Sequence, residues 1–388
     1  MCAETAYLIA LTAAFLQGDT VTLREDIDYR KLCGIAKAHN LIAVVYAVCN
    51  KSPNSAVIPE DCRVAVSEHF FSSVFLYEHQ KQGVEQVYRA LSDAGIPHVL
   101  FKGAILKELY PVPECRLMGD IDILIDPIHR QAAKQALMSN GFTCTAQNGP
   151  VYDYRKGDVL LEVHTALISD DPRCETAFAD AINRAQFEGC CGKLEDNYHF
   201  AYLIAHLAHH FRFYGAGIKL ILDLAVMLQK CQIDLEAVLA LCRQAGLEQF
   251  AKIILTVCYR WYGVGQPYVE DIDPCQAFLV SYGAFGNAQR NKSAVIARRQ
   301  LEHGETVGPV RSKLHLAFPA YSEMRHIPYI RFLDGRPWLT PYAWCYRLIY
   351  NARHRKAFMV RTARGLNSDD AYAAAKEELE FFKEMGLL

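Results

Sequence analysis

The stretch Gly119-Asp-Ile-Asp-Ile-Leu-Ile125 sets two acidic residues among apolar ones and runs directly into Asp126-Pro127. Because successive side chains of a strand point to opposite faces, it predicts a strand with Asp120 and Asp122 on one face and the isoleucines toward the core. Two carboxylates this close repel each other and normally stay ionised only beside a cation, usually Mg²⁺ or Mn²⁺. The stretch therefore predicts a strand with a candidate metal site, although one Asp could instead cap a turn while the other is solvated.

The residues on either side predict a small α+β unit. Gly95-Ile-Pro97 ends a helical region, after which 98–102 has the pattern of a short strand and 103–110 that of a helix. An aspartate at the N-cap and a proline at the first helical position predict a helix over 127–139. Residues 142–167 then predict two or three antiparallel strands.

The first strand joins its helix at Lys102-Gly103-Ala104. A glycine at this point would let backbone N–H groups and the helix N-terminus approach a phosphate closely. Lys102 and Arg116 are suitable counter-charges for a triphosphate, although either could equally be a solvated surface residue. The turn is therefore a candidate phosphate-binding element.

A third carboxylate, Glu162, lies in the apolar segment Val159-Leu-Leu-Glu-Val-His164, where an unpaired charge would be costly to bury. If this strand lies beside the first, Asp120, Asp122 and Glu162 could hold two metal ions for an in-line displacement at phosphorus. Glu162 could instead face solvent on an edge strand. His164 shares the face of Glu162 and would contact metal or substrate, or be a hydrogen-bonded core imidazole.

A histidine cluster follows in a segment with helical periodicity. His206 and His210 are four residues apart and share a helix face, with His209 between them and Asp223 beyond the break at Gly215-Ala-Gly217. This spacing is compatible with a zinc or iron hydrolase, but the pair contains no glutamate of the H-E-x-x-H kind. The favoured interpretation is a helix beside the active site, in which one imidazole touches substrate.

Residues 311–364 hold eleven Lys and Arg against two acidic residues, a local charge of +9, with seven Tyr, Phe and Trp side chains interleaved between 329 and 350. Such a mixture suits RNA, by phosphate neutralisation and base stacking. The alternative, which we favour from sequence, is a basic helix that packs its aromatic face onto the acidic remainder of the chain.

Composition and pattern together indicate a folded protein of several parts. The chain has 388 residues, 52% of them hydrophobic, and a formal charge of −2, which argues against intrinsic disorder and against binding driven by overall charge. Fourteen scattered cysteines without a C-x-x-C pair, and no uninterrupted apolar span, favour a cytoplasmic protein with reduced thiols and no membrane contact. We expect an α+β fold in which a small mixed sheet is flanked by N-terminal and C-terminal helical regions. The sequence from about residue 175 onward predicts helices. The expected regions are 1–94 (helical), 95–190 (α/β core), 191–306 (helical) and 307–388 (basic, aromatic-rich, helical).

These motifs resemble a known family. Phe101-Lys-Gly-Ala104, Tyr110-Pro-Val-Pro113, Arg116 and Gly119-Asp-Ile-Asp122 are similar to the uncharacterised nucleotidyltransferase family, a divergent branch of the DNA polymerase beta-like nucleotidyltransferase superfamily. The similarity extends to further motifs: Leu161-Glu-Val-His164, His206 with His209-His210, Leu222-Asp-Leu224, Ala317-Phe-Pro319, Trp338-Leu-Thr-Pro341 and Trp344. The turn departs from the superfamily pattern, since it reads Lys-Gly-Ala where Gly-Gly or Gly-Ser is usual.

The resemblance implies a metal-dependent nucleotidyltransferase that moves a nucleoside monophosphate from an NTP such as ATP to an acceptor hydroxyl and releases pyrophosphate. It implies Asp120, Asp122 and Glu162 as catalytic ligands of Mg²⁺ or Mn²⁺, with two ions. The expected nucleotide-binding residues are Lys102, Gly103, Ala104, Arg116 and Gly119, and the candidate substrate contacts are His164, His206 and His210. The acceptor, whether protein, RNA or small molecule, is left open, as is an inactive nucleotide-binding or regulatory module of the same fold; a His/Asp metal-dependent hydrolase is the third alternative.

Overall fold

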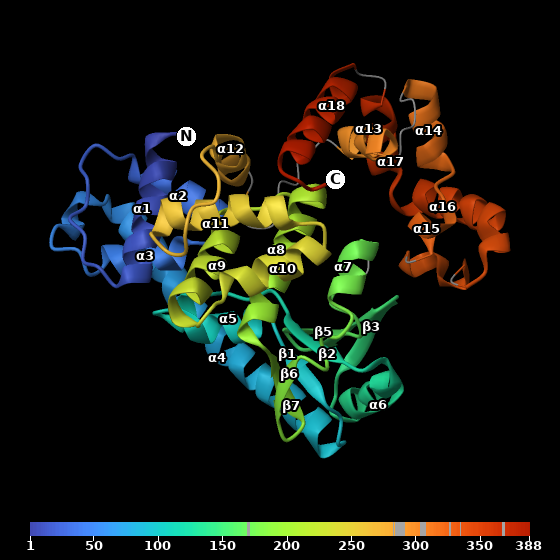
Figure 1. Cartoon of the computed structure of the whole chain (residues 1–388), viewed down its shortest axis with the longest axis horizontal. Coiled ribbons are helices and arrows are strands. Elements are labelled where there is room, and N and C mark those ends of the chain that lie inside the picture. Colours follow the sequence, from blue (N-terminus) through green and yellow to red (C-terminus); the bar gives the residue numbers. More distant parts are fainter. Residues whose placement is uncertain are drawn as a thin grey trace. The chain divides into compact units, whose positions relative to one another are not determined.

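The computed structural model describes residues 1–168, 171–281, 283, 292–302, 308–325, 327–333, 335–366 and 369–388 (Figure 1). The chain divides into two compact units, which are considered separately. The first comprises Met1–Thr145 with Pro150–Asn287, and the second comprises Ala146–Gly149 with Ala288–Leu388. The finer division into four regions stays a prediction.

The first unit begins with helices, as its apolar periodicity predicts. They are α1 (Ala3–Gln17), α2 (Tyr29–Ala38), α3 (Ile42–Cys49) and α4 (Glu60–Asp93), with the short 3-10 helix η1 (Ser55–Val57). The second half of α4 packs against the sheet through Val87 and Leu91. Gly83 permits this close approach, because a Cβ at that position would lie 3.0 Å from the methyl groups of Val159.

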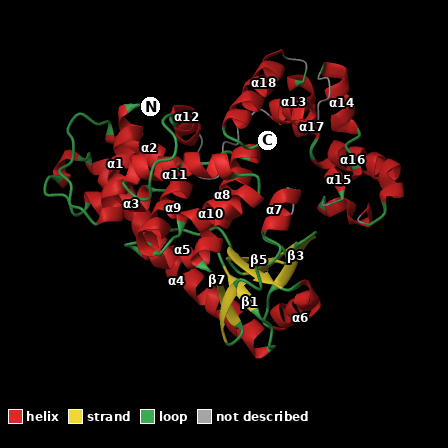
Figure 2. Cartoon of the chain, viewed as in Figure 1, coloured by secondary structure: helices red, strands yellow, loops and turns green. Residues whose placement is uncertain are grey.

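The first unit contains one mixed sheet, drawn in yellow in Figure 2. Among the described residues it has seven strands in the order β3-β4-β5-β2-β1-β7-β6. Their bounds are β1 (His98–Leu100), β2 (Ile121–Ile125), β3 (Thr143–Asn148), β4 (Val151–Lys156), β5 (Val159–His164), β6 (Ala185–Glu188) and β7 (Cys191–Leu194). Strand β2 runs parallel to β5 and antiparallel to β1, which confirms the expected α+β fold with a mixed sheet and helical flanks.

The two faces of the sheet differ in character. Ile121, Ile123 and Ile125 pack with α4 and α6 in one apolar cluster, as the alternation in the sequence predicts. The opposite face carries the acidic residues and is covered by α8, whose Tyr202 ring packs edge-on against Phe101 directly after β1. The acidic side chains are therefore enclosed between the sheet and a helix.

The expectation of purely helical structure from about 175 onward is wrong for residues 185–194. Strands β6 and β7 form an antiparallel hairpin there, and β7 runs parallel to β1. Each strand has only four residues. Two alternations per strand are too few for a periodic pattern to emerge from the sequence.

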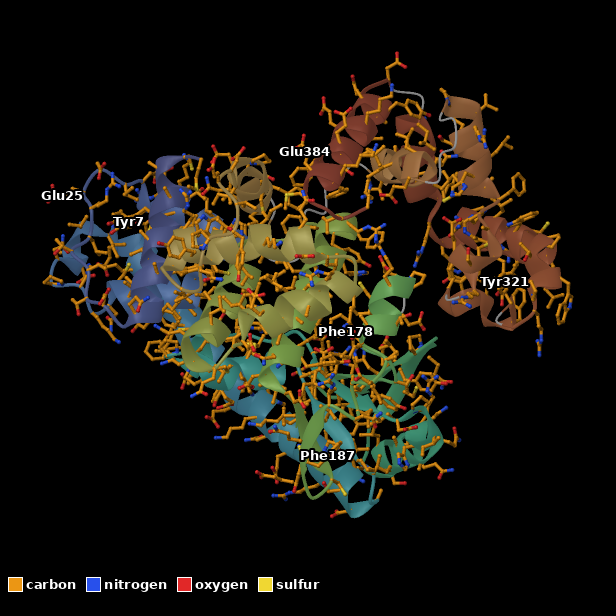
Figure 3. All side chains as sticks on the ribbon, in the orientation of Figure 1. Tyr7, Glu25, Phe178, Phe187, Tyr321 and Glu384 are labelled. Atoms are coloured by element: carbon orange, nitrogen blue, oxygen red, sulfur yellow. The ribbon has the colours of Figure 1, made fainter. Side chains whose placement is uncertain are left out.

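The remaining elements of the first unit lie between and after the strands along the chain. They are α5 (Gly103–Leu109), η2 (Pro113–Cys115), η3 (Pro127–His129), α6 (Arg130–Ser139), α7 (Pro172–Ala177), α8 (Asp196–Phe213), α9 (Ile218–Lys230), α10 (Leu235–Gln244), α11 (Glu248–Tyr262) and α12 (Asp273–Ser281). Asp126 caps the turn after β2, where its carboxylate accepts a hydrogen bond from the Ile128 N–H at 2.9 Å. Phe178, labelled in Figure 3, follows α7 and packs edge-on against Tyr198 of α8.

From residue 292 onward, the described part of the second unit is helical. Its helices are α13 (Lys292–Glu302), α14 (Pro309–Ala317), α15 (Tyr321–Met324), η4 (Pro328–Leu333), η5 (Pro337–Leu339), α16 (Thr340–His354), α17 (Lys356–Gly365) and α18 (Asp369–Glu384). No described helix of either unit combines the length and the apolar character needed to cross a bilayer.

Candidate active site

The central acidic residues come from two neighbouring strands. Asp122 of β2 lies opposite Glu162 of β5 in the parallel register, so the two carboxylates are side by side on one face. His164 follows two residues later on that face, and its Nε2 lies 3.0 Å from Asp122 Oδ1 and 3.2 Å from Glu162 Oε2. The condition stated from the sequence, that the Glu162 strand lies beside the Asp122 strand, is met.

The charges of these groups are strongly coupled. Burial raises the pKa of Asp122, but Lys102 and the hydrogen bond from His164 outweigh it, so the net shift is downward. The hydrogen bond from His164 also lowers the pKa of Glu162. For His164, burial lowers the pKa, but the hydrogen bonds with Asp122 and Glu162 raise it by more, so the net shift is upward. This favours an imidazolium that donates to both carboxylates.

Asp120 immediately precedes β2 and behaves differently. Burial, followed by repulsion from Asp122 and Glu162, raises its pKa to about 6. Asp122 forms an ion pair with Lys102, whose Nζ lies 2.7 Å from Asp122 Oδ1. Among the ion pairs of the described residues, none involves Asp120. Asp120 is thus the carboxylate whose ionisation has most to gain from an added cation.

The ligand geometry partly matches the set expected from the sequence. Asp122, Glu162 and His164 offer ligand atoms that all lie within 4.8 Å of one another, and they form the one such group of three found among the described residues. His164 joins this group, whereas Asp120 adjoins it along the same face. Asp153 of β4, which the sequence did not single out, lies opposite Glu162 on the other side and extends the acidic row.

The Lys102 turn is held in an uncommon conformation. Lys102 has φ 49° and is one of two non-glycine residues with positive φ in the described chain, the other being Asn40. Its backbone N–H donates to Nε2 of the buried His199 at 3.1 Å, while its side-chain ammonium contacts Asp122. Gly103 is packed closely, because a Cβ there would lie 2.9 Å from Met118 Cγ. The glycine at this turn therefore serves packing as well as any ligand.

Arg116 is occupied by a carboxylate. Its Nε and Nη2 donate to Asp223 of α9 at 2.7 and 2.9 Å, and its Nη1 donates to the Leu117 carbonyl at 2.8 Å. The Tyr110 hydroxyl donates to the same Asp223 at 2.6 Å. This buried network ties the loop before β2 to α9.

Lys219 is a functional candidate that the sequence reasoning missed. It lies one turn before Asp223 on α9, is buried, and its Nζ donates to the Leu117 carbonyl at 3.2 Å. Burial, followed by the charge of Arg116, lowers its pKa to about 7, while Asp223 and Asp120 act in the opposite direction. The signal available in the sequence was a lysine set in the apolar segment Ile218-Lys-Leu-Ile-Leu222, where a charge needs a reason.

Helix α8 lines the same region with imidazoles. His206 Nε2 lies 3.1 Å from His210 Nε2, which confirms that the two residues share a helix face. Burial, followed by the charge of Lys102, lowers the pKa of His206, and burial lowers that of His210 to about 4. Both rings are therefore neutral near pH 7, and within the described chain no third metal ligand accompanies them.

A pocket opens at the end of the sheet where Gly119 and Asp120 lie. Its wall includes Phe75 and His79 of α4 and Leu160 of β5. Ile121 and Val159, which belong to the apolar cluster packed with α4, also line this hollow. It therefore lies on the α4 side of the sheet and not on the face of the acidic row.

Comparison with known proteins agrees with the geometry. The chain matches no curated protein and no solved structure. Residues 25–263, more than half of the chain, match the sequence profile of a family described as "Uncharacterised nucleotidyltransferase". This range includes helices α2 to α4, the whole sheet and α8 to α11, while α1 and the motifs noted after residue 300 lie outside it. The chain therefore belongs to the uncharacterised nucleotidyltransferase family.

Proposed function

We propose that the protein is a metal-dependent nucleotidyltransferase that transfers a nucleoside monophosphate from an NTP to an acceptor hydroxyl and releases pyrophosphate. The observation that carries the proposal is the register of Asp122 and Glu162 on adjacent parallel strands, with Asp120 two residues before on the same face. Gathering buried carboxylates in this way is costly for a fold that needs only stability. Family membership supports a general role in nucleotidyl transfer.

The donor set fits a hard divalent cation. Carboxylate oxygens are the ligands that Mg²⁺ and Mn²⁺ prefer, and the raised pKa of Asp120 reflects repulsion that a cation would relieve. Asp120, Asp122 and Glu162 would hold two ions, with His164 beside them. Bound there, the metal would neutralise the carboxylates and polarise the phosphates.

The chain's own residues would complete the reaction. The acceptor oxygen forms a bond to the α-phosphorus while the bond from that phosphorus to the oxygen bridging to the β-phosphate breaks, and pyrophosphate leaves. Glu162 takes the proton of the acceptor hydroxyl, close to the His164 imidazole. Lys102 and Lys219 offset the negative charge that develops on the phosphates.

The triphosphate would lie near the Lys102-Gly103-Ala104 turn and Gly119. A phosphate could bind Arg116 directly only by displacing Asp223 from a bidentate pair. Lys219, whose Nζ is held by a carbonyl oxygen, is the cation that a phosphate could recruit at lower cost. Arg116 would then act by fixing the loop that leads to Asp120.

Transfer from NTPs labelled at the α-phosphate tests the proposal, with Mg²⁺ or Mn²⁺ and a cell lysate as the source of acceptors. We expect label on an acceptor with the wild-type chain and none with Asp122→Asn or Glu162→Gln. Glu85→Gln is the matched control, since it makes the same change in an exposed carboxylate on α4. Undiminished transfer by Asp122→Asn would contradict the assignment.

A catalytically inactive nucleotide-binding module is the second candidate. One observation favours it: the Lys102 ammonium lies 2.7 Å from Asp122 Oδ1 and occupies an oxygen that a metal would need. This candidate predicts that NTP binds, measured by calorimetry, while no pyrophosphate is released with any acceptor. Pyrophosphate release that requires Asp122 would exclude it.

A further inference from the structure

Helix α16 of the second unit has one face toward its own core and one face exposed. Ala343 is buried against Met324 and Leu333 in the core of this unit. On the flank of the helix beside Ala343, Tyr342 is 59% exposed and Tyr346 is 39% exposed, one turn apart. The exposed face continues through Ile349, and Trp338, 72% exposed, lies just before the helix. This is an unusual concentration of large aromatic side chains at the surface.

The exposed rings are held by their neighbours. The Phe332 ring packs against Tyr342 at 5.3 Å and against Tyr346 at 5.6 Å, measured between ring centroids. The Tyr329 and Tyr350 rings stack at 3.9 Å within the same unit. A ligand that stacks on these rings would therefore lose little side-chain entropy on binding.

The segment around this face is strongly basic. Residues 335–366 contain seven Lys and Arg and no Asp or Glu. Arg347 is used internally, since its guanidinium donates to the carbonyl of Leu316 at 2.9 Å. Among the side chains of this segment that the structure describes, the exposed cations are Arg336, Arg353, Arg355, Lys356 and Arg364. A partner with regularly spaced negative charge complements this surface.

We propose that the exposed face of α16, with Trp338 and the adjacent cations, binds single-stranded RNA. Unpaired bases expose their ring faces for stacking on Tyr342 and Tyr346, and the phosphates between them can meet the arginines. Duplex RNA hides its base faces and would not use the aromatic side chains. The surface lies outside the family match, and binding there requires neither NTP nor metal, so it does not depend on the proposed transfer.

Fluorescence anisotropy of a short labelled oligouridine, titrated with the full-length protein at several salt concentrations, tests the electrostatic part. Each phosphate neutralised on a single strand contributes about −0.7 to the slope of log affinity against log salt. Replacing Arg353, Arg355 and Lys356 by Gln should therefore make that slope shallower by about 2. The matched control replaces three exposed arginines of the first unit, Arg30, Arg63 and Arg89, and should leave affinity and slope unchanged.

A second variant tests the aromatic part. Tyr342→Leu with Tyr346→Leu keeps apolar surface but removes the rings, and should weaken oligouridine binding about 10- to 100-fold. Circular dichroism melting verifies that both variants fold. The proposal is overturned if the leucine variant binds as tightly as wild type, or if duplex RNA binds as well as oligouridine. It is also overturned if anionic phospholipid vesicles bind the protein while oligouridine does not.

Discussion

The buried ion pair between Arg116 and Asp223 gives the sharpest prediction, because its burial sets how much unfolding free energy is lost when the pair is broken. The two side chains are 8% and 4% exposed, and Asp223 accepts two hydrogen bonds from Arg116 and one from Tyr110. Asp223→Asn keeps the shape but removes the charge and turns an amide donor toward a guanidinium donor. Leaving a buried arginine without its counter-charge costs about 3–5 kcal/mol of unfolding free energy.

Urea unfolding measures this effect, followed by the fluorescence of Trp261 in a background whose other tryptophans are replaced by Phe. Glu85→Gln is the control, because the Arg89–Glu85 pair is 71% and 52% exposed and should contribute less than about 1 kcal/mol. Arg116→Met with Asp223→Leu removes both charges and should restore most of the lost stability, since an apolar replacement of a buried pair is often close to neutral. A loss below about 1 kcal/mol for Asp223→Asn, or a double variant as unstable as the single one, would refute the reasoning.

Three further predictions follow from the site. Because folding raises the pKa of Asp120 to about 6, its ionisation opposes folding, and the penalty is absent at low pH and complete above the folded pKa. Without divalent cations, Asp120→Asn should therefore have a higher melting temperature than wild type at pH well above 6, but not near pH 4. Differential scanning fluorimetry measures this difference, and an equal difference at both pH values would contradict the prediction. The pH profile of kcat/KM should fall above about 7 as Lys219 loses its proton, whereas a profile without this fall would exclude that role of Lys219. Lys219→Met should lower kcat/KM about 100-fold, while the melting temperature stays equal or rises because the change removes a buried amine. Steady-state kinetics and melting of the same preparation check this. Unchanged kinetics would count against a role of Lys219 in the reaction.

Much of the core was predictable because its signals are local. Alternation in Gly119–Ile125 predicts both the strand and the shared face of its aspartates, since side-chain direction in a strand has a period of two. The helices before residue 95 follow in the same way from their apolar spacing. The β6–β7 hairpin was missed because its strands are too short to show a period, and Asp153 was missed because only the pairing of β4 with β5 sets it opposite Glu162.

The sequence by itself determined most of the strands and helices other than the β6–β7 hairpin, which residues of a strand share a face, and that a strand carrying Glu162 needed a partner for its charge. Only the tertiary structure decided the partners. It set Glu162 beside Asp122, added His164 to the ligand group, and assigned Arg116 to Asp223, 107 positions away along the chain. The physical reason is that periodic patterns depend on neighbouring residues, whereas a buried charge pairs with whichever opposite charge the packing brings near, at any distance in sequence.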